Sequence, residues 1–178
     1  MKQIITTTLL SITVLITCRF SQNPGAGADP TDLLPVNNDI SGFERTGSAA
    51  IMTDKQTIYN AIDGAAEKYI DYGFIEGAQQ NFSNGRIDVD VQVFNHGTPQ
   101  NARAVFADDD IYPSTPSIIN AGDPHVVLDL TNPFAYSILY QRNNIFLRIN
   151  SSEKSDFALN MVKQFYLNID TKIEQITN

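Results

Sequence analysis

The chain has 178 residues, of which 42% are hydrophobic and 18% charged, and this length suffices for one domain of ordinary size. Twenty acidic residues against twelve basic ones give a net charge of −8. This balance argues against nucleic acid or an anionic membrane surface as a partner, because both are bound through Lys and Arg. One Cys and two His exclude a disulfide framework and a Cys/His zinc site, and no phosphate-loop or dinucleotide motif is present. The sequence therefore predicts no metal and no cofactor.

The N-terminal segment is typical of an export signal. Lys2 supplies a positive charge, and residues 4–17 form an uncharged, mostly apolar run that is shorter than the about 20 residues of a membrane span. We therefore assign residues 1–17 to a signal peptide. Residues 18–38 contain several Pro and Gly and no periodicity, which predicts a flexible tether. The sequence thus predicts an exported protein of a bacterial envelope.

Two processing sites compete within this segment. The run Leu15-Ile16-Thr17-Cys18 resembles the bacterial lipobox, in which the Cys becomes the lipidated first residue, with Thr17 in place of the usual Gly, Ala or Ser. The run Ala26-Gly27-Ala28 fits the small-x-small pattern of the general signal peptidase. The first site predicts a membrane-anchored lipoprotein with its lipid on Cys18, and the second a free periplasmic protein.

Residues 39–178 predict one α+β domain, whose first expected helix runs from about Asp54 to Tyr72. Gly73 lies where a left-handed C-terminal cap belongs. Gly64 interrupts the helix interior at a cost of about 1 kcal/mol relative to Ala, so either the helix breaks there or another element packs closely. Apolar residues recur at helical spacing along this segment; they are Ile58, Tyr59, Ile62, Ala65, Ala66, Tyr69 and Ile70.

A hairpin follows, with strands at residues 74–82 and 86–94 around the turn pair Asn84-Gly85. The second strand alternates apolar and polar residues, which predicts one buried and one solvated face. The remaining expected elements are a short strand within residues 42–52, a helix at 99–107, strands at 125–130, 134–141 and 145–150, and a helix at 153–169. Together they predict a single, mostly antiparallel sheet of five or six strands packed with three helices.

Part of the chain resembles a family of exported bacterial proteins that is known only as a domain of unknown function. The resemblance rests on Ile62-Asp63-Gly64-Ala65-Ala66-Glu67, followed by Tyr69 and by Tyr72-Gly73-Phe74, and on Gly97-Thr98-Pro99 after a valine-rich strand. His96 stands where family members often have Met. The resemblance implies an exported α+β domain and no particular activity. The layout is also similar to that of the photosystem PsbP-like proteins, which bears on the fold alone.

The candidate ligand-binding residues lie on and after the first helix: Asp63, Gly64, Glu67, Tyr69 and Tyr72. Asp63 and Glu67 are four residues apart, so they share a helix face and could act as acid and base or hold a cation. Alternatively, Asp63 caps a broken helix and Glu67 is solvated. The tyrosines either shape a pocket or belong to the core with their hydroxyls at its surface.

The other polar clusters favour simple structural roles. The run Asp108-Asp109-Asp110 lacks the alternation and the Gly of a calcium loop and predicts a solvated acidic loop. The two His residues have no catalytic partner at motif spacing. We therefore expect a non-catalytic domain that binds an envelope protein or a small ligand, and the alternative is a hydrolase that uses the pair Asp63 and Glu67.

Overall fold

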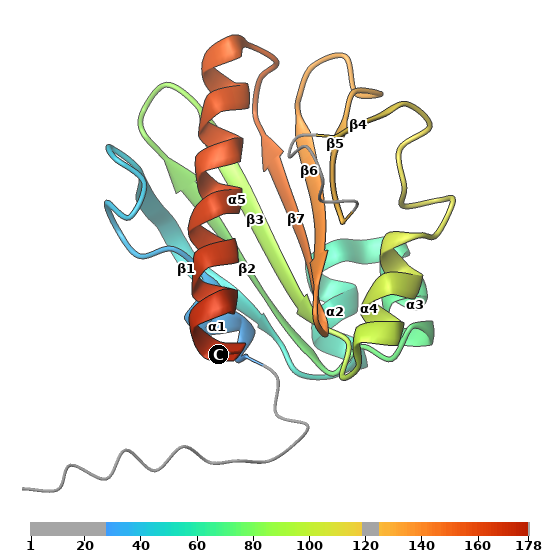
Figure 1. Cartoon of the computed structure of the whole chain (residues 1–178). Coiled ribbons are helices and arrows are strands. Elements are labelled where there is room, and N and C mark those ends of the chain that lie inside the picture. The colour runs from blue at the N-terminus through green and yellow to red at the C-terminus, as the bar shows by residue number, and fades with distance from the viewer. Residues whose placement is uncertain (1–27, 119–124, 178) are drawn as a thin grey trace, which may run out of the picture.

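The computed structural model describes residues 28–118 and 125–177, except for the side chains of Asp63, Ile118 and Thr177. The expected signal peptide and the candidate lipidation site Cys18 lie outside the described residues. Within them the chain forms one antiparallel sheet of seven strands in the order β1-β2-β3-β7-β6-β5-β4 (Figure 1). The strands are β1 (Glu44–Met52), β2 (Glu76–Ser83), β3 (Asp88–Asn95), β4 (Pro116–Ile118), β5 (Val126–Asp129), β6 (Ser137–Arg142) and β7 (Ile145–Ser151).

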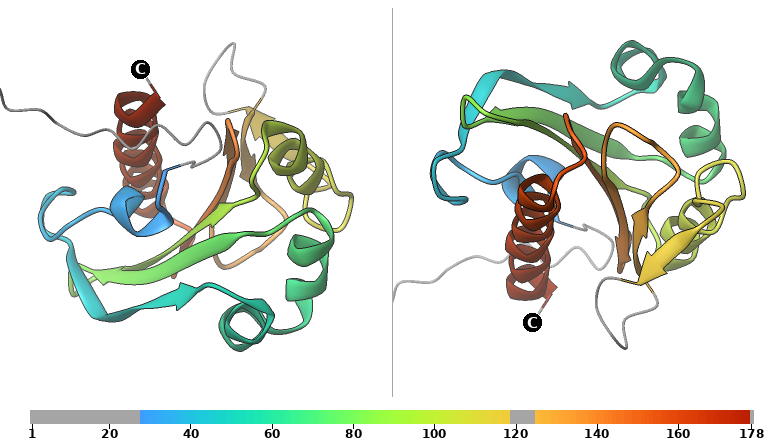
Figure 2. Two further views of the ribbon diagram at one scale, coloured as in Figure 1. Left: turned by 90° about the horizontal axis from the view of Figure 1, so that it is seen from below. Right: turned by 90° about the horizontal axis from the view of Figure 1, so that it is seen from above.

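Helices lie on both faces of this sheet. Figure 2 shows α5 with α1 on one face and α2, α3 and α4 on the other. Their bounds are α1 (Pro30–Leu33), α2 (Lys55–Ile62), α3 (Ala66–Asp71), α4 (Pro99–Phe106) and α5 (Asp156–Thr177), with a 3₁₀ turn η1 (Asp63–Ala65) between α2 and α3.

The α+β class and the single antiparallel sheet are confirmed, but the expected five or six strands and three helices are too few. β4 has only three residues and begins with Pro, so it leaves no alternating pattern in the sequence. The first helix divides at Gly64, where an added Cβ would meet no atom within 4 Å. The chain therefore breaks the helix there, and Gly64 does not serve a close approach between elements.

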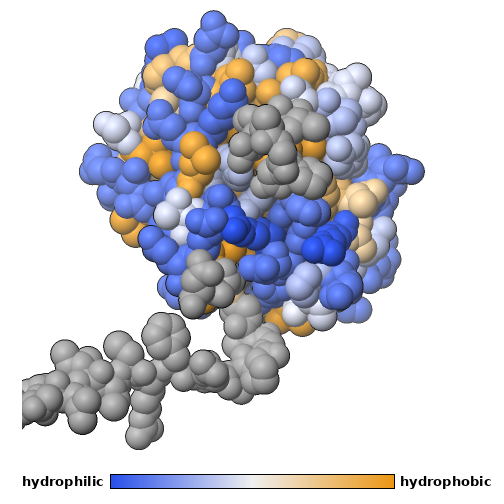
Figure 3. All heavy atoms as spheres, viewed as in Figure 1, coloured by the Kyte–Doolittle hydropathy of each residue, from blue (hydrophilic) through white to orange (hydrophobic). Residues whose placement is uncertain are grey.

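One face of the sheet packs against α5. Val89, Val91 and Val93 point into this core from β3, as their alternation predicts. Phe165 on α5 packs edge-on against Phe43 with ring centroids 5.2 Å apart. α5 is longer than the predicted helix at 153–169, because its last turns still bury apolar side chains in the same core. On the outward side of α5, hydrophobic residues form separate patches among hydrophilic ones (Figure 3).

Ion pairs also hold α5 against the sheet. The Tyr140 hydroxyl donates to the Asp170 carboxylate. Arg142 binds the same carboxylate through Nη1 at 2.6 Å and Glu174 through Nη2 at 2.8 Å. Since Tyr140 and Arg142 lie on β6, this network fixes the C-terminal half of α5 over that strand.

The packed domain begins earlier than the expected boundary at residue 39. Asp29 caps α1 by accepting a hydrogen bond from the Thr31 amide at 2.8 Å. Leu33 and Leu34, which the sequence places in the tether, are fully buried in the α5 core. Lys172 on α5 donates to the Leu34 carbonyl at 3.0 Å. Residues 28–38, which the sequence assigns to the tether, therefore include a one-turn helix that packs against α5.

The opposite face of the sheet is divided between an apolar and a polar half. Phe94 on β3 and Phe146 on β7 are paired in register and are buried under α2, α3 and α4. Further along the same strands the pairs become Gln92 with Arg148 and Asp90 with Asn150. All four of these polar side chains are partly exposed. The helices thus cover one end of this face and leave the other end polar.

His96 lies fully buried at the end of β3. Its Nδ1 is 2.9 Å from the Tyr72 carbonyl, so Nδ1 carries the proton and donates. Its Nε2 is buried without a hydrogen-bond partner among the described residues. Burial lowers the pKa of His96 from its ordinary 6.5 to about 4, and the hydrogen bond to Tyr72 opposes this change only in part. The imidazole is therefore neutral at pH 7.

Substitution of Gly73 tests the turn that links α3 to β2. Gly73 has φ +73°, and an added Cβ would collide with Asn101 Nδ2, which donates to the His96 carbonyl. We expect Gly73→Ala to lower the free energy of unfolding by about 2 kcal/mol or more, from the left-handed backbone plus the displaced hydrogen bond. Gly85 is a matched control, because its φ is +77° with nothing within 4 Å of a Cβ, so Gly85→Ala should cost about 1 kcal/mol. Equal losses in urea unfolding would contradict the steric account.

The buried His96 predicts a pH-dependent stability. The unfolded chain takes up a proton on this residue below pH 6.5, whereas the folded chain does so only near pH 4. The contribution of neutral His96 to the free energy of unfolding is therefore fully present above pH 6.5. It is lost as pH falls toward 4, by about 3 kcal/mol in total. His96→Phe should remove this part of the pH dependence, as measured by denaturant unfolding of both proteins from pH 7.5 to 4. Parallel curves for the two proteins would refute the assignment.

Candidate functional site

A cavity of about 550 Å³ lies where η1 and α3 meet the polar half of the sheet. Two other depressions of the described surface measure about 300 and 320 Å³. The larger volume is within the range of small-molecule sites. Its lining comes from η1 and α3, from the loop after α4, and from the sheet side: Gly64, Ala65, Lys68, Tyr69, Asp110, Ile111, Tyr112, Pro113, Ser114, Asp129, Thr131 and Arg148.

Tyr69 is the most buried polar residue of this lining, and Arg148 is partly buried. The Tyr69 ring packs on Phe94 with centroids 4.6 Å apart, and the residue is only 2% exposed. Arg148 lies close enough for its charge to act on the Tyr69 hydroxyl, and both residues line the cavity. Burial raises the pKa of Tyr69, and the nearby Arg148 opposes this in part. The phenol therefore stays protonated at neutral pH.

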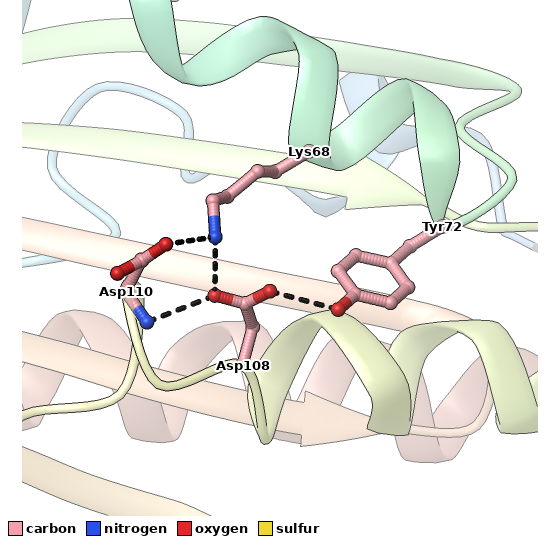
Figure 4. A network of polar contacts seen from close by, with 4 residues as sticks. All are labelled: Lys68, Tyr72, Asp108 and Asp110. Carbon is pink, nitrogen blue, oxygen red and sulfur yellow. Dashed lines mark hydrogen bonds and ion pairs between the residues drawn. The ribbon is translucent and has the colours of Figure 1, made fainter.

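One wall of the cavity is fixed by an ion-pair network between α3 and the loop after α4, which Figure 4 shows from close by. Lys68 Nζ lies 2.8 Å from Asp108 Oδ1 and also binds the Asp110 carboxylate. The Tyr72 hydroxyl donates to Asp108 Oδ2 at 2.7 Å. The hydrogen bonds from Lys68 and Tyr72 lower the pKa of Asp108 to about 2. Asp108 is thus ionised and connects two elements that are distant in sequence.

The acidic run is therefore only partly the solvated loop that the sequence predicts. Asp108 is 12% exposed in its side chain, whereas Asp109 is exposed. The partner Lys68 lies 40 residues earlier in the chain, and no local pattern signals such a pairing.

The structure brings some of the sequence-predicted candidates together and separates others. Gly64 and Tyr69 both line the cavity, and Tyr72 supports its wall through Asp108. Glu67 lies instead in the depression of about 320 Å³, where its carboxylate accepts from the Tyr59 hydroxyl at 3.1 Å. The side chain of Asp63 is outside the described part. Glu67 therefore lies apart from Tyr69.

Sequence reasoning missed Lys68 and Arg148. Arg148 does carry a signal, because it interrupts the mostly apolar strand Ile145–Ser151. A strand of this type places residues on two faces in turn, so a lone Arg marks a point where the second face is open. Lys68 carries no such signal, since it lies on an ordinary amphipathic helix.

The described residues contain no group of three or more His, Cys, Asp or Glu side chains arranged to hold a metal ion. In the same part of the chain, every helix is too short or too polar to cross a membrane.

Comparison with known proteins identifies a likeness in fold. No family model matches the chain, and no curated protein matches it in sequence. Among solved structures, the extracellular domain of PknH from Mycobacterium tuberculosis is similar with a TM-score of 0.57. The match covers 85% of this chain and 99% of that chain at 13% sequence identity. At this identity the likeness shows a shared fold and does not transfer a function.

Removal of the Asp108 charge should loosen the cavity wall. We expect Asp108→Asn to lower the free energy of unfolding by about 1 kcal/mol, because the pairing is partly screened by solvent. The pKa of Asp108 is about 2 in the folded protein against an ordinary 3.8. The stability that ionised Asp108 contributes is therefore present above pH 4 and is lost as pH falls through 2. Asp109→Asn removes the same charge at the adjacent, exposed position and should change stability little. Urea unfolding at pH 7 checks both variants. Equal losses of unfolding free energy would show that the ion-pair network does not stabilise the fold.

Proposed function

We propose that the chain is an exported, non-catalytic binding domain of a bacterial envelope, and that it takes a small polar ligand in the cavity next to η1 and α3. The observation that carries this proposal is the cavity itself, with the Tyr69 hydroxyl and the Arg148 guanidinium among its lining groups. A cavity of this size with a few convergent polar groups is the usual form of a small-molecule site.

The export part of the proposal is supported by the N-terminal sequence. Residues 1–17 have the pattern of a signal peptide, and Cys18 lies in a lipobox-like run. Nine residues separate Cys18 from Ala28, which is buried in the α5 core, so a lipid on Cys18 would lie within about 30 Å of this core. The resemblance of the Ile62–Glu67 motif to exported proteins and the fold likeness to an extracellular domain agree with this location.

A small ligand is favoured over a partner protein by the distribution of exposed apolar side chains. A protein-docking surface usually presents a contiguous apolar patch. On the face with α5, hydrophobic residues are scattered (Figure 3). The exposed large hydrophobic residues of the described chain include Val36 before β1, Ile75 before β2 and Phe134 before β6, which belong to different loops. The cavity is therefore the better-formed recognition element.

The proposal predicts that a bulky side chain at Ala65 blocks the cavity. Ala65 is exposed and lines it, so Ala65→Trp fills space without disturbing the core. We expect the wild-type protein, purified from a bacterial envelope, to carry an additional non-covalent mass in native mass spectrometry. Ala65→Trp should lose this mass.

Ala107→Trp provides the matched control, because Ala107 is exposed at the end of α4 and does not line the cavity. This variant should retain the bound mass. A mass that persists in Ala65→Trp, or that is lost in both variants, would place the ligand elsewhere. The same spectra report whether the chain starts at a lipid-modified Cys18 or at Asp29.

A further inference from the structure

Arg148 occupies an unusual position for a cation. It lies in the middle of β7, paired with Gln92 on β3 and with Leu139 on β6, and it is partly buried at the cavity. Its Nε is 3.3 Å from Asn150 Oδ1, and its charge acts on the Tyr69 hydroxyl at the same cavity. Among the side chains that the structure describes, no carboxylate forms an ion pair with it. A guanidinium has five N–H donors, so most of them are left for another acceptor.

The neighbouring carboxylates are occupied by other partners. Asp90 accepts hydrogen bonds from three amide groups, those of Gln79 at 2.7 Å, Gln92 at 2.8 Å and Asn150 at 3.2 Å. Asp129, which lines the cavity, accepts from the amide and hydroxyl of Thr131. Asp110 is bound to Lys68. Asp110 is thus paired with another cation, and Asp90 and Asp129 are held by neutral donors; none of the three forms an ion pair with Arg148.

Tyr69 adds a second donor at the same place. A guanidinium can only donate, so the Tyr69 hydroxyl beside Arg148 can offer it only the phenol oxygen and keeps its own proton. The proton of the phenol is then free to donate to a group in the cavity. Since the ring packs against both Phe94 and Phe146, with centroid distances of 4.6 and 5.9 Å, this donor has a fixed position. Two adjacent donors, one of them charged, favour an oxyanion as the complementary group.

We infer that the ligand of this cavity carries a carboxylate or phosphate group, which binds to the Arg148 guanidinium and the Tyr69 hydroxyl. The inference rests on the proposed function and specifies the chemical class of the ligand. The cavity volume of about 550 Å³ limits the ligand to a small molecule. The planar fork of Arg148 matches the two oxygens of either group.

The test uses the ¹⁵N-labelled processed protein and three salts at constant ionic strength: sodium phosphate, sodium acetate and sodium chloride. We expect the Arg148 Nε–Hε resonance to shift saturably with phosphate or acetate, with a dissociation constant on the order of millimolar for such small probes. Chloride should cause no saturable shift. The stronger of the two oxyanions identifies the ligand group as phosphate or carboxylate. The absence of a saturable shift with both oxyanions would overturn the inference.

Variants locate the binding. Arg148→Gln should weaken anion binding at least tenfold, and Tyr69→Phe should weaken it severalfold. Both dissociation constants are followed on backbone amides of the cavity lining. Arg148→Lys keeps the charge in case Arg148→Gln fails to fold, and it should still lose severalfold because the fork is absent. Arg103→Gln is the matched control, since Arg103 is exposed on α4 and does not line this cavity. Equal losses in Arg103→Gln, or no loss in the Arg148 variants, would overturn the inference.

The outcome is separable from that of the proposed function. A co-purified mass that Ala65→Trp loses, in a protein that binds neither phosphate nor acetate, would retain the cavity as a site for a neutral ligand and reject the anion. Anion binding that depends on Arg148 but persists in Ala65→Trp would support the Arg148 contact while it rejects the enclosed cavity as the binding space.

Discussion

Each central strand must serve two faces of the sheet, and this constraint organises the rest of the molecule. Successive side chains of a strand point to opposite sides, so β3 and β7 each need a partner layer on both. On one side they present valines, leucine and isoleucines, which lie in one core with residues of α5 and α1. On the other side the same strands change from Phe94 and Phe146 to polar residues. That change fixes where α2, α3 and α4 can pack, and where the sheet meets solvent.

The cavity follows from this incomplete cover. The helix that starts at Lys55 does not continue straight across the sheet, because it breaks at Gly64 and resumes as α3. Lys68 on α3 then binds Asp108 in the loop after α4. These two segments form the sides of the cavity, and the polar part of the sheet forms its base. A continuous helix would have needed an apolar sheet beneath it. The polar residues of β3 and β7 and the break at Gly64 are therefore parts of one arrangement.

Local signals in the sequence predict much of the fold but little of the site. The alternation of β3, the hairpin turn and the helix end at Gly73 all depend on residues close in the chain, and the structure has each of them. The packing of Leu33 and Leu34 depends on α5, more than a hundred residues later, and a Pro-rich segment gave no hint of it. The contact of Lys68 with Asp108 is equally long-range. Among the candidates, Tyr69 and Gly64 share one cavity because they lie on one side of the broken helix, whereas Glu67 faces another depression.

Tyr69 is the residue at which the core and the candidate site meet. Its ring lies against Phe94, Phe146 and the neutral His96, with the imidazole centroid 6.0 Å away, while its hydroxyl reaches Arg148. The apolar packing thus sets the position of a polar group at a cavity. Protonation of His96 would place a charge in the layer that supports this ring, so acid would weaken the core and the site through the same contact. The fold likeness to a domain with 13% identity concerns the layers of helix and sheet, whereas what the cavity can bind depends on these few side chains of this chain.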